Sequence, residues 1–443
     1  MNLRQHQSTL ERRLWVATYL VAFLCPLVLL AFAPARGADQ LTLFSIALGF
    51  LGFTGIVLQL VIPSRAPQFT AAFGIGLLLR LHRYMGGVVL LLVAAHIGVF
   101  VWHNQGKYVQ WLYPIHGPFK AQAGWVAAAA LLLIAFTSYF RRRLKLGYET
   151  WRYLHIALST LIVSGAFVHV LLISWFSSIE SLRWLVVAAL MIGLVALVYL
   201  RVGRPFAALG SPFVIREVIA ERGGSTTLQL EAVNHPGISF RPGQFAWIKV
   251  QGKPFSLTEH PFSFASSAFL PSQPSFTIKG LGDFTREVGK LIPGTPVIID
   301  GPHGAYEPVL PDAGYVLIVG GVGITPAMSI IRTCVSAGDI SRPLRLIYGA
   351  QTWDEVTFRE ELLDAQHLID LEVLFVITNP PDDWQGYSGR IDKTTLPGML
   401  PTDAMERNYF VCGPPRMIDG VMHALHDIGV PDALVYADRF DSV

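Results

Sequence analysis

The chain has 443 residues, of which 52% are hydrophobic and only 15% are charged, and its formal net charge is +3. Soluble proteins average about 25% charged residues, so this composition excludes an ordinary soluble protein over the whole length. The apolar excess lies in the first half of the chain. We therefore expect the lipid bilayer as a partner, and no nucleic acid.

Six apolar segments in the first half each have about the 17–25 residues that a spanning helix needs, the fourth being the shortest. They are Leu14–Phe32, Leu41–Ile62, Leu81–Trp102, Trp125–Phe140, Tyr153–Trp175 and Trp184–Leu200. The first segment has a long apolar run without a clear small-residue cleavage pattern, so we predict a helix there and not a signal peptide. The sequence predicts an α-helical membrane domain of six transmembrane helices over residues 1–205.

Two of these segments carry histidines at the same interval. His82 and His96 lie on the third segment, and His155 and His169 lie on the fifth. Fourteen helical steps rise roughly 21 Å and fall about 40° short of four whole turns, so both members of a pair point the same way near opposite faces of a bilayer. One histidine in an apolar helix can be an ordinary buried residue, but intramembrane ionisable groups are functional by default. Because neutral imidazole is a standard axial ligand of haem iron, the repetition predicts two haems stacked across the membrane.

The distribution of Lys and Arg in the short loops predicts the orientation of the spans. Most of these residues fall in the loops of one side: Arg4, Arg12, Arg13, Arg65, Arg80, Arg83, Arg141, Arg142, Arg143, Lys145 and Arg152. The opposite loops hold only Arg36, Lys107, Lys120 and Arg183. We therefore predict an integral protein of the inner or plasma membrane with both termini cytoplasmic. His82 and His155 then form an inner pair, and His96 and His169 an outer pair.

From Gly210 the composition is that of a soluble protein. Five strand patterns separated by turn signals predict a small antiparallel β-barrel over residues 206–311: Phe213–Ala220, Thr226–Val233, Phe245–Val250, Phe262–Ala265 and Ser275–Lys279. Beyond this, residues 312–443 show the strand–helix–strand pattern of an α/β domain with an open parallel sheet.

A glycine-rich turn follows the first strand of the α/β domain. The predicted strand Tyr315–Val319 leads into Gly320, Gly321, Val322 and Gly323, and Thr325 and Pro326 then open a helix that runs to about Cys334. Glycines let backbone N–H groups approach a pyrophosphate, and the helix N-terminus favours an anion. Further predicted elements complete a nucleotide-binding sheet: strand Leu344–Tyr348, helix Val356–Ala365, strand Leu371–Val376 and strand Tyr409–Cys412, with Gly413, Pro414 and Pro415 after it.

Several motifs together resemble one known family over nearly the whole chain. They are H-P-F-S at residues 260–263, G-D-F-T at residues 282–285, G-G-V-G-I-T-P at residues 320–326, C-G-P-P at residues 412–415 and the paired H-x13-H. This combination is similar to the ferric reductase/NADPH oxidase superfamily. The resemblance implies a ferredoxin-NADP reductase-like module, formed by an FAD-binding barrel and an NAD(P)H-binding lobe, behind a six-helix dihaem domain.

The resemblance also implies roles for individual residues. Ser263 would lie near the flavin ring, and His260 and Thr285 would contact the ribityl-phosphate region. Gly321, Thr325 and Cys412 would line the nicotinamide path. Phe440 matches the aromatic residue that stacks on the isoalloxazine near the end of family members, and it joins Ser263 and Cys412 as a catalytic candidate. The other cofactor-binding candidates are Pro261, Phe262, Lys279, Gly282, Asp283, Gly320, Gly323, Pro326, Gly413 and Pro414.

Each of these residues also has an ordinary structural interpretation. Ser263 can be a polar strand residue, His260 a turn residue and Thr285 a helix cap. Cys412 can be buried filler at a strand end, and Phe440 a core residue.

Cysteine usage excludes one route for electrons. Cys25, Cys334 and Cys412 are far apart and have no ferredoxin spacing, so we expect no iron–sulfur cluster. No C-x-x-C-H motif is present, so the two haems are predicted to be b-type and held without covalent attachment. Electrons are then expected to pass from NAD(P)H to FAD and directly to the haems.

The sequence leaves two questions open. Oxygen-reducing relatives have a second histidine one turn beyond the outer ligand of the third span, where this chain has Phe100, although His103 and His116 can serve instead. The acceptor is therefore an Fe(III) or other metal chelate, molecular oxygen or a periplasmic redox protein. The donor is NADPH or NADH, because Gly349, Ala350, Gln351 and Thr352 offer no cation to a 2′-phosphate and Arg390 is the remaining candidate.

Overall fold

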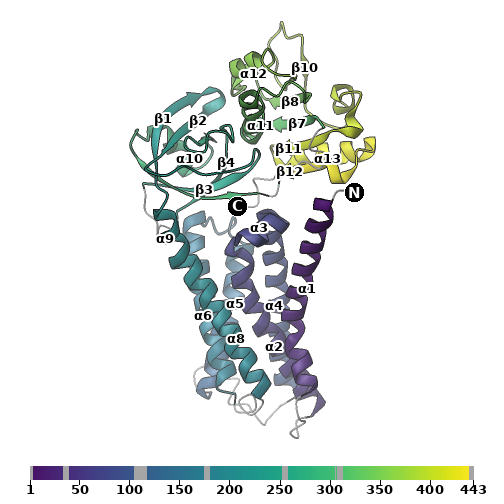
Figure 1. Cartoon of the computed structure of the whole chain (residues 1–443). Helices are drawn as coiled ribbons and strands as arrows, with labels where there is room; N and C mark the ends of the chain where they lie inside the picture. Colours follow the sequence, from purple (N-terminus) through teal and green to yellow (C-terminus); the bar gives the residue numbers. More distant parts are fainter. Residues whose placement is uncertain are drawn as a thin grey trace. The chain divides into compact units, whose positions relative to one another are not determined.

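The structure is a computed structural model that describes residues 3–32, 39–103, 117–173, 180–251, 258–304, 306 and 313–438. Figure 1 labels its helices and strands. The chain forms two compact units, Met1–Arg204 and Pro205–Val443.

The first unit consists of apolar helices. They are α1 (Leu3–Ala31), α2 (Gln40–Val61), α3 (Pro67–Phe73), α4 (Ile75–His103), α5 (Phe119–Tyr139), α6 (Tyr148–Leu171) and α8 (Glu180–Val198). Among the described residues, α1, α2, α4, α5 and α6 are long and apolar enough to cross a membrane. These five helices correspond to the first five predicted spans. The sixth predicted span falls on α8, whose apolar stretch Arg183–Ala196 is shorter than the other five.

Small residues let these helices pack closely in two pairs. A Cβ added to Gly52 of α2 would lie 3.0 Å from Val93 Cγ2 of α4. A Cβ added to Gly165 of α6 would lie 2.8 Å from the carbonyl oxygen of Ala123 in α5. Close backbone approach through small residues is typical of helix pairs in membranes. The pairs α2–α4 and α5–α6 therefore each contain one of the two histidine-bearing helices.

The second unit begins with the short helix α9 (Arg204–Leu209) and contains a six-stranded antiparallel sheet of order β4-β3-β6-β1-β2-β5. Its strands are β1 (Phe213–Glu221), β2 (Ser225–Ala232), β3 (Phe245–Val250), β4 (His260–Ser263), β5 (Ser275–Lys279) and β6 (Pro296–His303). The sequence patterns predicted the first five and missed β6. A bridge between Phe264 and Phe276 joins the segment after β4 to β5, so the two edge strands of the sheet are linked.

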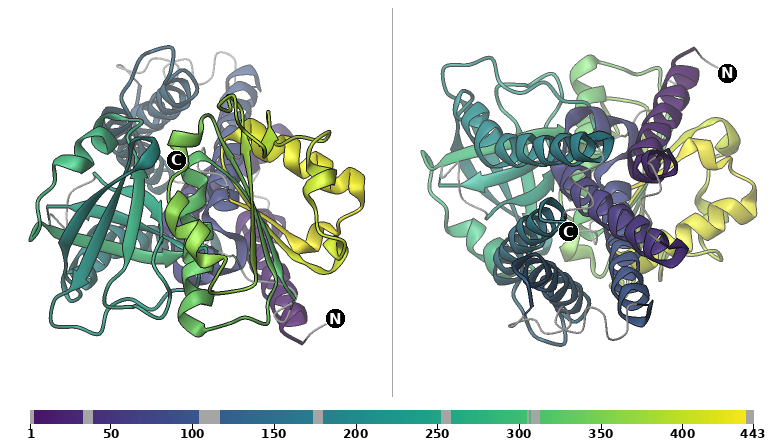
Figure 2. Two further views of the ribbon diagram at one scale, coloured as in Figure 1. Left: turned by 90° about the horizontal axis from the view of Figure 1, so that it is seen from above. Right: turned by 90° about the horizontal axis from the view of Figure 1, so that it is seen from below.

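A six-stranded sheet of order β10-β9-β8-β7-β11-β12 follows, and all of its neighbouring strands are parallel. Its strands are β7 (Tyr315–Gly320), β8 (Leu344–Ala350), β9 (Leu371–Ile377), β10 (Tyr387–Ser388), β11 (Asn408–Cys412) and β12 (Val435–Asp438). Its helices are α11 (Ile324–Ala337), α12 (Arg359–Ala365) and α13 (Pro415–Ile428). The view from above in Figure 2 shows α11 and α13 on opposite faces of this sheet.

Two details of the parallel sheet differ from expectation. Helix α12 begins at Arg359 and not at Val356, because Phe358 before it has a left-handed backbone with φ of 60°. The sequence patterns also missed β10, β12 and α13. Helix α13 has the signals of a helix all the same, since Pro415 occupies its first position and Gly429 ends it with φ of 93°.

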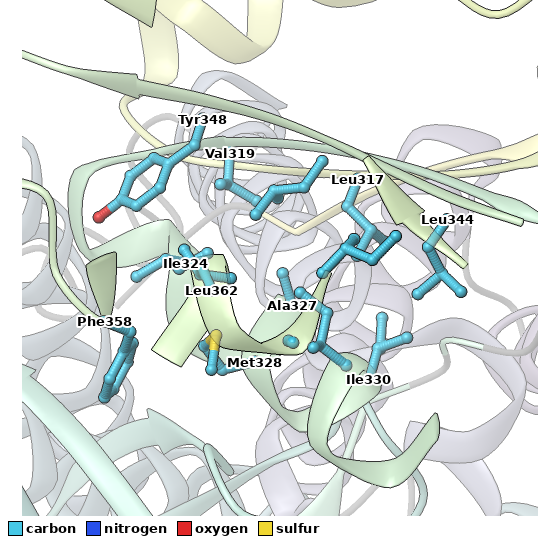
Figure 3. Close-up of a cluster of buried hydrophobic side chains, with 14 of the residues drawn as sticks. Leu317, Val319, Ile324, Ala327, Met328, Ile330, Leu344, Tyr348, Phe358 and Leu362 are labelled. Carbon is cyan, nitrogen blue, oxygen red and sulfur yellow. The ribbon is translucent and has the colours of Figure 1, made fainter. Parts of the chain in front are cut away.

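One core of the parallel sheet lies between the strands and α11. Figure 3 shows Leu317 and Val319 from β7 with Ala327 and Met328 from α11, all completely buried. Burial of an amphipathic helix face against a sheet is the main source of stability in such a layer.

Helix α11 also binds the antiparallel sheet's domain through hydrogen bonds. Ser329 Oγ donates to the carbonyl of Ser266 at 2.8 Å, and Arg332 donates to the carbonyl of Ala265 at 2.8 Å. Thr333 Oγ1 accepts from the backbone N–H of Ala268 at 3.0 Å. Helix α11 therefore connects the parallel sheet to the domain of the antiparallel sheet at three points.

The antiparallel domain depends on a stack of phenylalanines. Phe264 is fully buried, lies 4.0 Å from Phe240 with nearly parallel rings, and lies 4.9 Å from Phe276. We expect Phe264→Ala to lower the free energy of unfolding by about 3–5 kcal/mol, because it removes a buried ring and leaves a cavity. Urea unfolding of the detergent-solubilised protein, followed by tryptophan fluorescence, measures this loss. Phe269→Ala, at a ring that is 62% exposed, is the control and should change little; equal losses in both variants would contradict the assignment of this core.

Candidate functional site

The four membrane histidines meet in two pairs. The ring centres of His82 and His155 are 6.2 Å apart with an interplanar angle of 52°. Those of His96 and His169 are 6.4 Å apart with an angle of 72°. Helices α4 and α6 each contribute one ring to each pair, so the equal spacing in the sequence appears as two facing pairs in the fold.

These separations fit a metal ion between the two rings of each pair. A bond from a metal to an imidazole nitrogen is about 2 Å long, so two rings on opposite sides of one ion have centres roughly 6 Å apart. Among the described residues no group of three or more His, Cys, Asp or Glu side chains could hold a metal ion. Two imidazoles and no third side chain is the ligand set that a bis-histidine haem requires.

Hydrogen bonds fix the tautomer of the 96/169 pair. His96 Nδ1 lies 2.8 Å from the carbonyl oxygen of Ser45, and His169 Nδ1 lies 2.7 Å from that of Lys120. A carbonyl oxygen only accepts hydrogen bonds, so each Nδ1 must carry the proton. In a neutral ring this leaves the lone pair on Nε2, which is the form that binds a metal.

The 82/155 pair is held differently. His82 Nδ1 is buried and has no hydrogen-bond partner among the described residues. His155 Nδ1 lies 3.5 Å from Ser138 Oγ, at the limit of a hydrogen bond. The backbone of Gln59 interacts with the His82 ring, but among the described residues no carbonyl lies within full hydrogen-bonding geometry of either inner ring, as it does in the other pair.

One of the two histidines considered for oxygen chemistry has a partner. His103 Nε2 lies 2.8 Å from Asp39 Oδ1 at the end of α4. Hydrogen bonds from Thr42 and from His103 hold the pKa of Asp39 well below its usual range. His103 is thus bound to a carboxylate, and His116 lies outside the described residues.

The two predicted flavin motifs come together in the antiparallel domain. His260 of the H-P-F-S motif stacks on Phe284 of the G-D-F-T motif, with ring centres 4.0 Å apart and planes 15° apart. Phe262 lies beside both rings, 6.3 Å from His260 and 6.4 Å from Phe284. The two motifs are separated in the sequence, so this aromatic surface forms only when the domain folds.

Ser263 ends β4 and is buried, and its Oγ has no hydrogen-bond partner among the described residues. A buried hydroxyl without a partner is costly unless a ligand satisfies it. Ser263 pairs in register with Phe245 of β3, and Phe245 pairs with His303 of β6. This row of the sheet therefore offers a polar atom to a bound group, which fits a flavin.

Other residues of the predicted flavin site have structural partners. Thr285 Oγ1 accepts from the backbone N–H groups of Gly282 and Leu281 at 2.7 and 2.9 Å, so it caps the short helix α10 (Asp283–Glu287). Lys279 ends β5, and its Nζ lies 3.8 Å from Glu355 Oε2. Pro261 pairs in register with Trp247 of β3. The predicted contacts of these residues with FAD stay predictions.

The nucleotide motifs meet where the strand order of the parallel sheet reverses. Strands β7 and β11 are neighbours, and the glycine turn follows the first while Cys412 ends the second. A Cβ on Gly323 would lie 2.4 Å from the carbonyl oxygen of Cys412, and a Cβ on Gly413 would lie 3.0 Å from the backbone N of Gly320. Ligands of open α/β sheets bind at this switch point, beyond the carboxyl ends of the strands.

The turn itself is held from both sheets. Gly321 has φ of 55°, a left-handed conformation that favours glycine. Tyr348 OH donates to its carbonyl at 3.2 Å, and burial raises the pKa of Tyr348 to about 12, so this donor keeps its proton. Thr325 Oγ1 donates to the carbonyl of Val322 at 2.9 Å and reaches that of Thr277 at 3.4 Å. Pro326 is buried in the first turn of α11.

Three predicted residues remain, namely Arg390, Pro414 and Phe440. Arg390 follows the edge strand β10, and its neighbour Ile391 packs against Gly349 at the end of β8. This brings the chain at Arg390 close to the stretch where a 2′-phosphate would bind. Pro414 precedes α13 and would contact a Cβ on Gly320 at 3.0 Å. Phe440 lies outside the described residues.

Sequence reasoning missed Asp438, which ends β12 and pairs in register with Cys412. Burial raises the pKa of Asp438 to about 6. Burial and the nearby Asp438 raise the pKa of Cys412 well above its ordinary value, so this thiol is neutral. The signal that could have found Asp438 is its position two residues before Phe440.

Three protein families match successive parts of the chain. The ferric reductase like transmembrane component matches residues 48–166, an FAD-binding domain matches residues 216–307, and the oxidoreductase NAD-binding domain matches residues 317–423.

Several curated proteins are similar to the chain over part of its length. The reductase component of propane 2-monooxygenase from Rhodococcus jostii is 28% identical over 49% of this chain and 60% of its own length. One of the proteins that make up the 1,2-phenylacetyl-CoA epoxidase of Escherichia coli is 30% identical over 46% and 59%. One of those that make up the Na(+)-translocating NADH-quinone reductase of Yersinia enterocolitica is 29% identical over 41% and 46%. The chain thus spans about half to three fifths of these relatives.

Solved structures are also similar. The ferredoxin reductase in carbazole 1,9a-dioxygenase has a TM-score of 0.45 and 25% identity, over 52% of this chain and 69% of that chain. A flavohemoglobin from Malassezia yamatoensis has a TM-score of 0.47 and 18% identity, over 81% and 97%.

Together, the apolar helices, the two sheets and the matched domains give a chain with helices long and apolar enough to cross a membrane, followed by an FAD-binding and an NAD-binding domain. The three domains follow one another in the order found in the ferric reductase/NADPH oxidase superfamily. The chain therefore has the architecture of that superfamily, and the resemblance seen in its motifs is confirmed.

Asp438 should make the stability of the second unit depend on pH. Its folded pKa of about 6 is above the ordinary 3.8, so the stability it contributes is present at low pH and is lost as the pH rises through about 6. We expect Asp438→Asn to reduce the difference in unfolding free energy between pH 5 and pH 8, measured by urea unfolding at both pH values. Asp427→Asn, at an exposed aspartate of α13, is the control. A wild-type pH profile in Asp438→Asn would contradict the raised pKa of this carboxyl.

Proposed function

We propose that the protein moves electrons from cytoplasmic NAD(P)H through FAD and two b-type haems to an acceptor on the outer face of the membrane. The observation that carries this proposal is the pair of facing imidazoles at each of two levels, 6.2 and 6.4 Å between ring centres, in a chain that also contains FAD- and NAD-binding domains.

When bound, FAD accepts a two-electron hydride from NAD(P)H and releases single electrons, and the haems carry these across the bilayer. The chain's own residues bind and orient these groups. We assign His82 and His155 to an inner haem, and His96 and His169 to an outer one. The protonated Nδ1 atoms of the outer pair aim both Nε2 lone pairs away from the carbonyls that hold them.

The proposal needs six spans, with both termini cytoplasmic and domain limits at residues 1–205, 206–311 and 312–443. The 19 residues of α8 rise about 28 Å, close to the thickness of a hydrocarbon core. Arg204, which follows α8, donates to the carbonyl of Ser64 at 3.0 Å. Ser64 lies just beyond the end of α2, so α8 and the span α2 reach the same end of the unit. This bond supports α8 as the sixth span.

For FAD, we propose a closed antiparallel barrel whose surface carries the aromatic rings of His260, Phe262 and Phe284. The bridge between Phe264 and Phe276 supports closure of the barrel. Ser263 would donate its buried hydroxyl to the flavin ring. Lys279, Gly282, Asp283 and Thr285 would shape the phosphate end of the site, with Thr285 acting through the helix cap that it forms.

For the nicotinamide nucleotide, we propose binding across the ends of β7 and β11. Gly320, Gly321 and Gly323 keep the pyrophosphate path free of side chains, and the neutral thiol of Cys412 faces the reacting ring without carrying charge. Arg390 is our candidate for a 2′-phosphate. Phe440 would cover the flavin until the nicotinamide enters.

Among acceptors, we favour a metal chelate such as Fe(III) chelate over oxygen. Phe100 occupies the position of the second histidine of oxygen-reducing relatives, and His103 is bound to Asp39 at 2.8 Å. These two features support a site without an imidazole reserved for oxygen. Relay of electrons to a periplasmic redox protein is the alternative from another class of function.

The haem assignment predicts distinct losses in four alanine variants. His96→Ala and His169→Ala should lose the outer haem and keep the inner one, because each iron depends on two imidazoles. His82→Ala and His155→Ala should lose the inner haem. Pyridine-haemochrome content per protein and the low-spin absorption spectrum measure these losses. His103→Ala, seven residues beyond His96 on the same helix, is the control; full haem content in all four variants would refute the assignment.

Assays of the purified protein with NADPH and with NADH distinguish the possible electron acceptors. Fast Fe(III)-chelate reduction that superoxide dismutase does not slow, with little oxygen consumption, is expected. Oxygen consumption with dismutase-sensitive dye reduction would assign an oxidase instead. If neither Fe(III) chelate nor oxygen is reduced while the haems are reduced at full rate, the relay to a protein partner replaces the metal-chelate proposal.

A further inference from the structure

We propose that Gly49 and Gly124 are positioning residues for the outer haem. Each makes room for the ring of one outer histidine to reach a backbone carbonyl, and the outer ligands thereby become stronger donors to iron than the inner ones. The inference rests on the proposed function and adds to it which haem has the lower reduction potential.

On α2, Ser45 and Gly49 form the site that receives the ring of His96, and we call such a pair of carbonyl and glycine a seat. The carbonyl of Ser45 accepts from His96 Nδ1 at 2.8 Å, and Ser45 Oγ donates to the carbonyl of His96 at 3.1 Å. A Cβ added to Gly49 would lie 3.0 Å from His96 Nδ1 and 3.1 Å from its Cε1. An alanine at this position would therefore push the ring away from the carbonyl.

On α5, Lys120 and Gly124 form the same seat for His169. The carbonyl of Lys120 accepts from His169 Nδ1 at 2.7 Å. A Cβ added to Gly124 would lie 2.7 Å from the same nitrogen, a distance that Cβ atoms essentially never show. The space is tighter here than on α2.

The two seats share one local design. In each, the accepting carbonyl and the glycine are four residues apart, so they lie one helical turn apart on the same face. The carbonyl already accepts its helical N–H bond from that glycine and uses a second lone pair for the imidazole. Two helices that are unrelated in sequence thus present the same seat to two symmetric ligands.

The inner pair lacks these seats. The backbone of Gln59 interacts with the ring of His82, but His82 Nδ1 has no partner among the described residues that meets the limits of a hydrogen bond. His155 Nδ1 has only the distant Ser138 Oγ at 3.5 Å. Glycines also occur near His82, but a Cβ on Gly86 would meet Gln59 and no histidine ring. The two pairs therefore differ in the partner of Nδ1.

The partner of Nδ1 tunes the ligand. Donation of the second ring N–H to a carbonyl makes the imidazole more basic toward its metal. A more basic ligand stabilises the ferric state over the ferrous state, so the outer haem has the lower reduction potential. The electron that reaches the outer face is then held by the stronger reductant of the two, which suits acceptors that are hard to reduce.

Pairs of glycine variants on the same helix pair test this in the full-length, haem-loaded protein. Gly49→Ala is matched with Gly52→Ala, whose Cβ would meet Val93 Cγ2 at the same 3.0 Å. Gly124→Ala is matched with Gly165→Ala, whose Cβ would meet the carbonyl of Ala123 at 2.8 Å. The matched variants disturb helix packing to a similar degree without touching a histidine.

The readouts are haem content, thermal midpoint and the two midpoint potentials from a spectroscopic redox titration. We expect Gly49→Ala and Gly124→Ala to raise the lower of the two midpoints, or to weaken retention of that haem by about 10- to 100-fold. Gly52→Ala and Gly165→Ala should lower the thermal midpoint alone. In His169→Ala, the component that remains should be the one with the higher midpoint. Because the two seats lie on separate helices, failure of one variant to fold leaves the other as the test.

Two results would overturn the inference. One is a remaining component in His169→Ala with the lower midpoint. The other is that Gly49→Ala and Gly124→Ala have the same haem content and midpoint potentials as their control variants Gly52→Ala and Gly165→Ala. If the histidine variants lose haem as proposed while the glycine variants match their partners, the haem proposal stands and only this inference fails. If the histidine variants keep both haems, the proposed function itself fails.

Discussion

An imidazole inside an apolar helix bundle has no water to satisfy its two nitrogens, and this constraint organises the first unit. At His96 and His169 one nitrogen is satisfied by a carbonyl of the neighbouring helix, at 2.8 and 2.7 Å. The second nitrogen keeps its lone pair, and a metal ion is a partner that this lone pair favours. The rings from α4 and α6 have their centres 6.4 Å apart. Close packing of α2 with α4 and of α5 with α6 is what brings the carbonyls within reach, so glycine placement, histidine tautomer and ligand geometry form one arrangement.

The second unit solves a different problem, since it must hold two ligands with their reactive parts together. Reversal of the strand order between β7 and β11 opens the nucleotide site. The aromatic surface of His260 and Phe284 forms from two motifs of the antiparallel sheet's domain. Both sites are built from segments that are distant in the sequence.

Much of this arrangement could be predicted from the sequence, for reasons that differ between elements. Five spans, five of the six antiparallel strands and the glycine turn after β7 follow from local patterns, because length, alternation and punctuation act within a few residues. The pairing of the four histidines also followed from spacing, because helical geometry is regular over fourteen residues. Strand β12 and its Asp438 were missed because a short, half-buried edge strand has little pattern of its own. The cap formed by Thr285 and the seats at Gly49 and Gly124 depend on partners that only the fold defines.

Helix α11 limits how the two domains of the second unit can move against each other. Its residues Ser329, Arg332 and Thr333 bind the domain of the antiparallel sheet, while its opposite side packs on the parallel sheet. A hinge motion between these two domains would have to break these three hydrogen bonds, together with those that join Arg222 to Glu360 and to Thr357. These contacts oppose a hinge motion between the two domains of the second unit.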